Sequence, residues 1–521
     1  MRHLSRVEWL CVIVVLWLAT GLRFAALERV PPALSVDEAL NGYEAYSLLN
    51  TGRDEWGTPW PVTIRGFNDY RRPAIIYSAI PFVALFGLDT FAIRAAAATW
   101  GLLTVLVVYR LARDMFGRGA GALTGLMLAI SPWHIAFSRS GREATVAILA
   151  VTVGMWCCWR WFKSRRPAWL AGAALAFGLS LYTYNTTQAF TPLMLAALAL
   201  IFAKPLWRQK RYAMMALLIV VLVAAPLIYA LASNSQSSNR LDYVTIFRPD
   251  EPLIQSASTA VKQWLGHFAP EYLFIRGDAH SVLHAPGFGQ LYAVDALLLP
   301  LGLLGIFQSK QNRRAGVILI AWIALGAVPA ALTIQEMGTA HSLRGSLGVP
   351  AYATLSALGL MTIWNARRVG RKARAALLGA LAGALVWNAA IVLQNYFVVY
   401  PVQSAHAFEY GIKEAVDYVT AHEDEYDTIA LTNWISQPHI FVLFFQRTDP
   451  RHFQAKHPEY NQKLSAKLKQ WDKFVVGDVD KLYSQMEHGL FVARPQMLPD
   501  LEPVKVIYHP DGSPAWKIIA K

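Results

Sequence analysis

Long apolar runs, each close to the length of a membrane-spanning helix, recur along the first 400 residues of this 521-residue chain. A helix needs about 20 predominantly apolar residues to cross the hydrocarbon core of a bilayer. The pattern therefore predicts a polytopic α-helical membrane protein of about eleven transmembrane helices: residues 7–26, 90–108, 119–137, 144–162, 168–184, 188–203, 212–231, 291–307, 315–334, 345–364 and 375–398. Only 16% of all residues are charged, against roughly 25% in soluble domains, which argues against a soluble enzyme.

The first apolar run follows Arg2 and Arg6 and has two interpretations. A basic start followed by an apolar stretch could be a cleaved signal peptide. Because many more apolar runs follow, we favour an uncleaved first span.

Basic residues beside the apolar runs predict the orientation of the chain. Short cytoplasmic loops are enriched in Lys and Arg. With eleven spans, all six basic clusters lie on the side of the N-terminus, which is then cytoplasmic: Arg2 and Arg6; Arg110, Arg113 and Arg118; Lys163, Arg165 and Arg166; Lys204, Arg208, Lys210 and Arg211; Lys310, Arg313 and Arg314; and Arg367, Arg368, Arg371, Lys372 and Arg374. If the ambiguous run 73–88 also crossed, every later cluster would face the other way, so we interpret that run as a juxtamembrane or re-entrant helix.

The same orientation puts four segments and the C-terminal part outside: residues 27–72, 131–142, 232–290, 335–344 and 400–521. From residue 400 the long apolar runs give way to short mixed ones, with a predicted helix at 405–420 and strands at 428–432, 473–476 and 516–519. We therefore predict a transmembrane module at residues 1–399, with outside loops 27–89 and 232–290, and an extracytoplasmic soluble α/β domain at residues 400–521. The expected location is the plasma membrane.

The net charge of +14 could indicate a nucleic-acid partner, but its position in the chain argues otherwise. Residues 401–521 carry a net charge of −3 and residues 1–400 carry +17, with 20 basic residues in the six clusters. Membrane topology explains this distribution, so we expect a lipid bilayer and no nucleic acid as partner.

Two adjacent acids, Asp37 and Glu38, follow the first span directly. Burial against neighbouring spans could raise the pKa of a carboxyl at this position and suit it to general-base catalysis. Alternatively, Ser35 caps a helix and the two acids lie in its first turn, where they interact favourably with the helix dipole.

Basic side chains in the outside segments complement these acids. Arginine presents a planar fork that suits phosphate oxygens, so arginines in several charge-poor loops indicate an anionic ligand. The alternative for each is an interaction with lipid headgroups. These residues are Arg71 and Arg72 before Pro73, Arg139 and Arg142, and His341 with Arg344.

The long outside loop and one membrane boundary contribute further candidates. His280 and His284 have the spacing of a helical metal pair, although Pro286 and Gly287 nearby argue against a regular helix. Asp278 could accept a sugar hydroxyl or cap a turn. Tyr184 lies at an outside boundary, where tyrosines usually form an aromatic belt.

Several other kinds of chemistry lack their sequence signatures. The chain has no Walker loop, no GxSxG and no HExxH motif. Its three cysteines, Cys11, Cys157 and Cys158, all lie in apolar runs and indicate neither a disulfide framework nor a CxxC metal site.

The acidic pair after the first span, the Arg-Arg-Pro start of the run at 71–73, the segment 131–139 and the multi-pass frame together resemble the GT-C glycosyltransferase superfamily. The resemblance is strongest to the branch of protein O-mannosyltransferases and aminoarabinose lipid transferases, which depend on a phospholipid carrier. It covers the membrane part well and the C-terminal part loosely. Relatives have Lys-Pro-Pro or His-Pro-Pro where this chain has Arg72, Pro73 and Ala74, which is a departure from the pattern.

This resemblance implies a hexosyl or pentosyl transfer, usually inverting, from a polyprenyl-phosphate carrier to an acceptor hydroxyl at the extracytoplasmic face. It implies that Asp37 is the general base and Glu38 the second acid of the pair. The acceptor, which could be a lipid, a glycan or a protein, stays open. No cofactor is expected, because the carrier bond supplies the driving force, and a divalent metal has no support in the sequence. The implied donor-phosphate site comprises Arg71, Arg72, Arg139, His341 and Arg344, and the implied substrate contacts are Tyr43, Tyr184, Asp278 and His280.

Two other functions stay open. A transporter or lipid flippase would share the polytopic frame, but transporters often carry charges at mid-membrane depth and related halves. Here ionisable residues concentrate at the ends of the spans, with Arg94 as the nearest exception. A catalytically silent receptor or scaffold is the third possibility.

Overall fold

The computed structural model describes residues 6–67, 69–233, 244–308, 310, 312–335, 337–435, 437–456, 459–461 and 467–521. Arg2 of the first basic cluster and residues 234–243 of the long outside loop lie outside this described part. The chain divides into two compact units. We call Met1–Ala25, Ala97–Arg139 and Glu143–Asn395 the helical unit, and Ala26–Ala96, Ser140–Arg142 and Tyr396–Lys521 the mixed unit.

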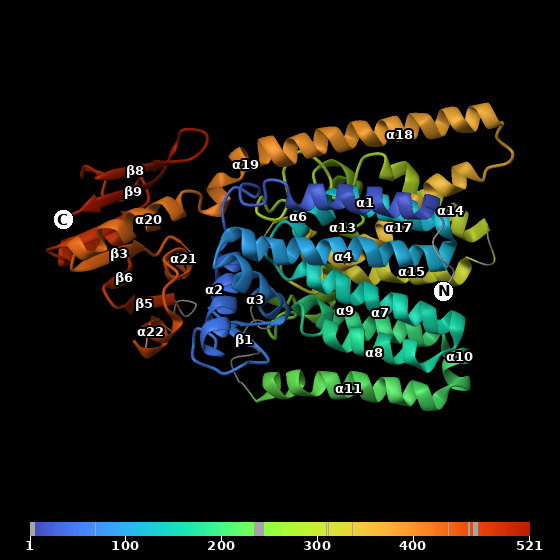
Figure 1. Cartoon of the computed structure of the whole chain (residues 1–521), viewed down its shortest axis with the longest axis horizontal. Coiled ribbons are helices and arrows are strands. Elements are labelled where there is room, and N and C mark those ends of the chain that lie inside the picture. Colours follow the sequence, from blue (N-terminus) through green and yellow to red (C-terminus); the bar gives the residue numbers. More distant parts are fainter. Residues whose placement is uncertain are drawn as a thin grey trace. The chain divides into compact units, whose positions relative to one another are not determined.

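The helical unit consists of long helices and short helical turns (Figure 1). Its central pair is α14 and α17, whose backbones approach closely at glycines: a Cβ added to Gly302 would lie 2.1 Å from the carbonyl oxygen of Leu355. Small residues at such contacts let membrane helices pack tightly. The elements are α1 (Arg6–Phe24), α4 (Thr90–Phe116, which begins in the mixed unit), α5 (Arg118–Ile130), α6 (Pro132–Ser138), α7 (Ala144–Ser164), α8 (Pro167–Ser180), α9 (Asn185–Ile201), α10 (Ala203–Arg208), α11 (Lys210–Ala232), α13 (Leu253–Gly266), η2 (Glu271–Ile275), α14 (Asp295–Gln308), α15 (Arg313–Gly326), α16 (Val328–Ala331), η3 (Ser346–Gly348), α17 (Val349–Trp364) and α18 (Arg371–Gln394).

Two helices of this unit, α11 and α18, expose apolar side chains along most of their length. Only 17% of the apolar window of α11 and 11% of that of the segment containing α18 is buried, whereas 83% is buried for the segment containing α17. Such long apolar surfaces belong in lipid, because water would make them aggregation sites. The chain is therefore a helical membrane protein.

By length and composition, six helices among the described residues can cross a membrane, or up to seven if the bent pair α5 and α6 is one span. The sequence count of about eleven is not reached because several of the expected spans are shorter helices: α8 and α14 have 14 residues each, and α9 has 17. The count of eleven stays a prediction. The ambiguous run forms α3, a helix of 13 residues that is about 20 Å long, whereas the hydrocarbon core is about 30 Å thick.

The mixed unit begins with α2 (Val36–Thr51), the hairpin of β1 (Ile64–Gly66) and β2 (Asp69–Arg71), and α3 (Ala74–Phe86). In the hairpin, Ile64 pairs with Arg71 and Gly66 with Asp69. Helix α2 packs against α3 within the unit.

The C-terminal part of the mixed unit contains a seven-stranded sheet of order β4-β5-β6-β3-β7-β9-β8. Strand β3 runs parallel to β6 and β7, and the outer pairs are antiparallel. The strands are β3 (Thr428–Thr432), β4 (Glu459–Asn461), β5 (Lys467–Trp471), β6 (Phe474–Gly477), β7 (Gly489–Ala493), β8 (Lys505–Tyr508) and β9 (Pro514–Ala520), and the helical elements are η4 (Asn395–Val399, which begins in the helical unit), α19 (Tyr400–Gln403), η5 (Ala405–Phe408), α20 (Ile412–His422), η6 (Glu423–Glu425), α21 (Pro438–Phe445), α22 (Pro450–Ala455) and α23 (Val479–Gln485).

The first outside loop and the C-terminal part form one packed body. Helix α2 approaches α21 so closely that a Cβ on Gly42 would lie 2.5 Å from a ring carbon of Phe444. Arg447 Nε donates a hydrogen bond to the carbonyl of Leu88 at 3.2 Å. The compact units thus differ from the predicted division at residue 399/400, because composition along the chain cannot show that a helix near residue 40 packs against one near residue 440.

Candidate active site

The acidic pair lies in the first turn of α2, and its helix begins with a capping box. Ser35 Oγ accepts a hydrogen bond from the backbone N–H of Glu38, while the Glu38 carboxylate accepts one from the backbone N–H of Ser35 at 2.9 Å. This arrangement satisfies two otherwise orphaned N–H groups. The predicted N-cap at Ser35 is therefore confirmed.

The Glu38 side chain is fully buried, although it was a candidate catalytic acid. Its Oε1 lies 2.9 Å from Arg94 Nε and accepts a hydrogen bond from the backbone N–H of Gly141 at 3.0 Å. Burial alone would raise the pKa of Glu38, but Arg94 and these N–H groups hold it below its ordinary value. The contacts give Glu38 a structural role in an ionised form, with no surface open to a substrate.

Asp37, one residue earlier, has the opposite environment. Its side chain is 31% exposed, and its two oxygens face two different arginines. Arg71 Nη2 donates to Oδ1 at 2.6 Å, and Arg142 Nη2 lies 3.8 Å from Oδ2. A carboxylate open to solvent beside two guanidinium groups is a chemically usable arrangement for proton transfer and anion binding.

The hairpin β1–β2 positions Arg71 at the end of its second strand. The guanidinium carbon lies 5.1 Å from the centre of the Phe67 ring, and a Cβ on Gly66 would lie only 2.9 Å from Arg71 Nε. Glycine at position 66 therefore leaves room for the Arg71 side chain to reach Asp37.

The segment 140–142 positions Arg142 through its neighbour Gly141, both of whose backbone groups are bound by side chains of α2. The N–H of Gly141 donates to Glu38, and its carbonyl accepts a hydrogen bond from Asn41 Nδ2 at 2.9 Å. A Cβ at this glycine would lie 2.4 Å from Ile93 Cγ2, so the close approach requires glycine. Glu38 thus fixes the segment that carries Arg142.

Two further candidates of the mixed unit are also buried. Arg72 is 6% exposed, and its Nη1 lies 3.4 Å from the carbonyl oxygen of Tyr70. Tyr43, predicted to contact substrate, is fully buried, and its hydroxyl donates to the carbonyl of Thr448 at 3.3 Å. Tyr43 therefore ties α2 to the C-terminal part and presents no surface to a substrate in this structure.

A second group of acids, for which no pattern in the sequence indicated a site, is buried in the same unit. Burial and the neighbouring carboxyls raise the pKa of Glu55 to about 8 and that of Glu44 well above its ordinary value. Glu44 Oε2 accepts a hydrogen bond from the backbone N–H of Glu55 at 3.1 Å. Burial also raises the pKa of Asp54. Because their pKa values are raised, these carboxyls keep their protons to a higher pH than free carboxyls do.

In the helical unit, Arg139 is completely buried. Its Nη1 donates to the carbonyls of Leu22 and Arg23, at 3.0 and 3.1 Å, near the end of α1. Positively charged side chains at a helix C-terminus satisfy carbonyls left without partners. These contacts give Arg139 a helix-capping role in this structure.

Asp278 and the surrounding histidines tie two loops of the helical unit together. The Asp278 carboxylate accepts hydrogen bonds from the backbone N–H groups of Ser342 at 2.5 Å and His280 at 2.9 Å, and its side chain is fully buried. His341 Nδ1 lies 3.8 Å from the same carboxylate, and burial together with Arg344 lowers the pKa of His341 to about 3. His341 is therefore neutral near pH 7 and carries no charge for a phosphate.

The remaining candidates of this unit also contact backbone or lie at helix ends. Arg344 Nη1 donates to the carbonyl of Ile334 and to Thr333 Oγ1, both at 2.9 Å. Tyr184 is 7% exposed and occupies the N-cap position of α9. His284 Nε2 lies 2.6 Å from the carbonyl oxygen of Phe288, so it is not directed toward His280 as a metal pair would be.

The structure thus brings Asp37, Glu38, Arg71 and Arg72 together in the mixed unit, whereas Arg139, Tyr184, Asp278, His280, His341 and Arg344 belong to the helical unit. Sequence reasoning named Arg142 among the outside arginines but did not assign it to the site. It noted Arg94 only as an exception near a helix start. The signal for Arg142 was Gly141 before it, a residue that permits the close approach to α2.

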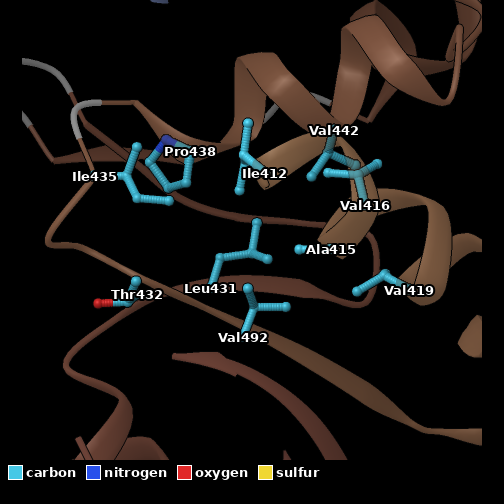
Figure 2. Close-up of a pocket in the computed structure, with 10 residues that line it drawn as sticks. All are labelled: Ile412, Ala415, Val416, Val419, Leu431, Thr432, Ile435, Pro438, Val442 and Val492. Atoms are coloured by element: carbon cyan, nitrogen blue, oxygen red, sulfur yellow. The ribbon is translucent and has the colours of Figure 1, made fainter. Parts of the chain in front are cut away.

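Among the described residues, neither metal-binding groups nor the small cavity of the C-terminal part offers another site for a sugar phosphate. No group of three or more His, Cys, Asp or Glu side chains in the described part of the chain could hold a metal ion. Figure 2 shows a small cavity in the C-terminal part, between α20, α21 and the strands β3 and β7. With Thr432 as its only polar side chain, it has no charge for a sugar phosphate; the lining residues are Ile412, Ala415, Val416, Val419, Leu431, Thr432, Ile435, Pro438, Val442 and Val492.

Comparison with solved structures defines the class of fold. The chain is similar to ArnT from Cupriavidus metallidurans, with a TM-score of 0.59 and 15% identity over 99% of this chain and 98% of that chain. ArnT has also been solved bound to undecaprenyl phosphate. The archaeal oligosaccharyltransferase AglB from Archaeoglobus fulgidus, solved with an inhibitory peptide and a dolichol-phosphate, matches with a TM-score of 0.56 and 12% identity over 99% of this chain and 74% of that chain. The chain therefore shares the fold of ArnT and AglB.

Comparison of the amino-acid sequence with known families and proteins agrees with the comparison of structures. Residues 72–229 match the family model described as dolichyl-phosphate-mannose-protein mannosyltransferase. The chain is 25% identical over 296 residues to undecaprenyl phosphate-alpha-4-amino-4-deoxy-L-arabinose arabinosyl transferase 1 of Pseudomonas fluorescens, which is 56% of this chain and 49% of the relative. It is 25% identical over 246 residues, 47% of this chain and 35% of the relative, to YycA of Bacillus subtilis, provisionally named a mannosyltransferase. The alignments span about half or less of the length of these relatives. The predicted resemblance to the GT-C superfamily is confirmed by these matches.

Proposed function

We propose that this chain is a membrane glycosyltransferase that moves a sugar from a polyprenyl-phosphate donor to an acceptor hydroxyl on the extracytoplasmic face of the membrane. The observation that carries the proposal is the solvent-open carboxylate of Asp37 between Arg71 and Arg142. The names of the relative and of the matching family support the donor class, since they refer to undecaprenyl phosphate and dolichyl phosphate.

In the proposed reaction, the acceptor hydroxyl oxygen attacks the anomeric carbon of the donor sugar. Its proton passes to the Asp37 carboxylate, which acts as general base. The bond between the anomeric carbon and the phosphate oxygen breaks, and the electron pair leaves with polyprenyl phosphate. Attack opposite to the leaving group would invert the anomeric configuration.

The arginines would stabilise the leaving phosphate, because its negative charge grows as the bond breaks. Fixed guanidinium groups stabilise such developing charge more than the ground state. Arg71 is the best-placed of the predicted donor ligands, since its side chain is 11% exposed and already binds one anion. Roles for Arg72, Arg139, His341 and Arg344 at the phosphate would require them to leave the contacts described above.

Glu38 would act through position rather than through chemistry. It is buried, paired with Arg94, and binds the backbone of the segment that carries Arg142. We therefore propose Glu38 as a positioning residue in place of a second catalytic acid.

The same proposal includes the finer organisation of the chain. Eleven spans would place the N-terminus in the cytoplasm and the α/β part at residues 400–521 outside a plasma membrane. The sugar would be a hexose or a pentose, no cofactor would be required, and the acceptor would be a lipid, a glycan or a protein.

The test is reconstitution in liposomes with a polyprenyl-phosphate sugar labelled in the sugar, without nucleotide. The proposal predicts label in an acceptor fraction and release of an equal amount of polyprenyl phosphate. The alternative of a transporter or flippase predicts movement of intact donor across the bilayer without cleavage. Intact donor after incubation with a range of lipid, glycan and peptide acceptors would contradict the proposal.

A further inference from the structure

Both oxygens of the Asp37 carboxylate face an arginine, so the candidate base and the candidate phosphate ligands neutralise one another. We propose that Arg71 and Arg142 form a clamp that holds either Asp37 or the donor phosphate, so that donor binding releases Asp37 for catalysis. This inference rests on the proposed function and adds Arg142 to the site as a second phosphate ligand.

Contacts of the neighbouring backbone fix the positions of the two arginines. The anion bound to them is therefore the partner that can be exchanged. Arg142 is 9% exposed, and the preceding Gly141 is bound through both its N–H and its carbonyl. Arg71 is 11% exposed and ends a paired strand. Guanidinium groups with so little contact with water are costly to leave without an anion.

Asp37 is the most exposed member of the group. Its side chain is 31% exposed, and the contact of Oδ2 with Arg142 Nη2, at 3.8 Å, is longer than a hydrogen bond. A phosphate offers more acceptor oxygens in a geometry that matches the guanidinium fork. It can therefore replace the carboxylate without moving either arginine.

The exchange has a consequence for the order of binding. Arg71, Arg142 and Asp37 together carry one net positive charge, which attracts the donor phosphate. When the phosphate takes both arginines, Asp37 loses its hydrogen bond from Arg71 and can accept the proton of the acceptor hydroxyl. The clamp therefore favours binding of donor before productive binding of acceptor.

A binding measurement separates the clamp from the chemistry. The probe is undecaprenyl phosphate, titrated in detergent into the purified full chain and its variants, with thermal stability as the check on folding. Asp37→Asn removes the competing anion and should bind the probe about tenfold more tightly than the wild type. Arg142→Gln should bind it about tenfold more weakly.

Matched controls come from exposed charges of the same unit. Asp424, whose side chain is fully exposed on η6, gives Asp424→Asn, and the 67% exposed Arg451 gives Arg451→Gln. Both should bind like the wild type, which shows that net charge alone is not responsible.

Each outcome decides a different point. Unchanged or weaker binding by folded Asp37→Asn would overturn the clamp, even if transfer requires Asp37. Tighter binding with normal transfer would support the clamp and contradict Asp37 as the base. A wild type that does not bind undecaprenyl phosphate would overturn both the clamp and the proposed donor.

Discussion

Two buried or half-buried aspartates, Asp37 in the mixed unit and Asp278 in the helical unit, were both site candidates and have different surroundings. Asp278 is enclosed and binds the backbone N–H groups of Ser342 and His280. Asp37 is partly exposed and binds the side chains of Arg71 and Arg142. A carboxylate whose partners are backbone groups holds loops together, whereas a partly exposed carboxylate bound to two fixed guanidinium groups can be replaced there by another anion.

The contrast is even sharper within the acidic pair, because Glu38 adjoins Asp37 but is completely buried. Removing one partner of a buried ion pair leaves the other charge uncompensated, at a cost of about 3–5 kcal/mol. We expect Glu38→Gln to lower the free energy of unfolding by about that amount, and Asp37→Asn to lower it by less, because the Asp37 side chain is 31% exposed and solvent screens its ion pairs. Chemical denaturation monitored on the mixed unit checks this. Equal losses for the two variants would remove the distinction between structural and functional acid.

The next effect concerns Asp278. In Asp278→Asn the backbone N–H groups of Ser342 and His280 face an amide, which has one acceptor oxygen and one NH2 group in place of two acceptor oxygens. We therefore expect a loss of about 1–3 kcal/mol in stability. The transfer rate per folded molecule should stay within a few-fold of the wild type. Differential scanning fluorimetry and a transfer assay normalised to folded protein measure the two quantities. A loss of transfer at full stability would place Asp278 in the site.

A smaller and pH-dependent effect comes from Glu55. Its pKa is raised from 4.5 to about 8 in the folded chain, so the folded state holds a proton that the unfolded state releases. Its contribution to stability is complete below about pH 4.5 and is lost as the pH rises toward 8. We expect Glu55→Gln to flatten the fall in melting temperature between about pH 5 and about pH 8. The control Asp424→Asn should show the same fall of melting temperature with pH as the wild type. The same fall in Glu55→Gln would contradict the raised pKa of Glu55.

The smallest effect is expected for Arg71→Lys. Lysine keeps the charge but lacks the planar fork that binds two phosphate oxygens together. We expect about a tenfold loss in transfer with little change in stability, since one tenfold step is about 1.4 kcal/mol. Steady-state rates at saturating acceptor test this. A variant as active as the wild type would show that charge alone matters at this position.

The sequence was sufficient for the class of fold, and it placed the candidate acid Asp37 and its partner Arg71 in the same loop. Long apolar runs and basic clusters report directly on the bilayer, and the acidic pair, the N-cap at Ser35 and the arginines before Pro73 lie close together in the chain. Contacts between distant segments were not accessible in this way. Arg142 reaches Asp37 because Gly141 packs on α2, and the glycine in the sequence permits this contact but does not identify its partner. Tyr43 is buried and bonded to Thr448, which no local pattern around residue 43 indicates.

The central claim is that Asp37 is the base and Glu38 its structural neighbour. The most direct test is the single-turnover rate of sugar transfer by Asp37→Asn at saturating donor. It is compared with the rate of the wild type at a temperature at which melting curves show both proteins to be folded. General-base catalysis contributes about 10²- to 10⁴-fold, so the rate should fall by at least about 100-fold while donor binding persists. A rate within a few-fold of the wild type would contradict the claim.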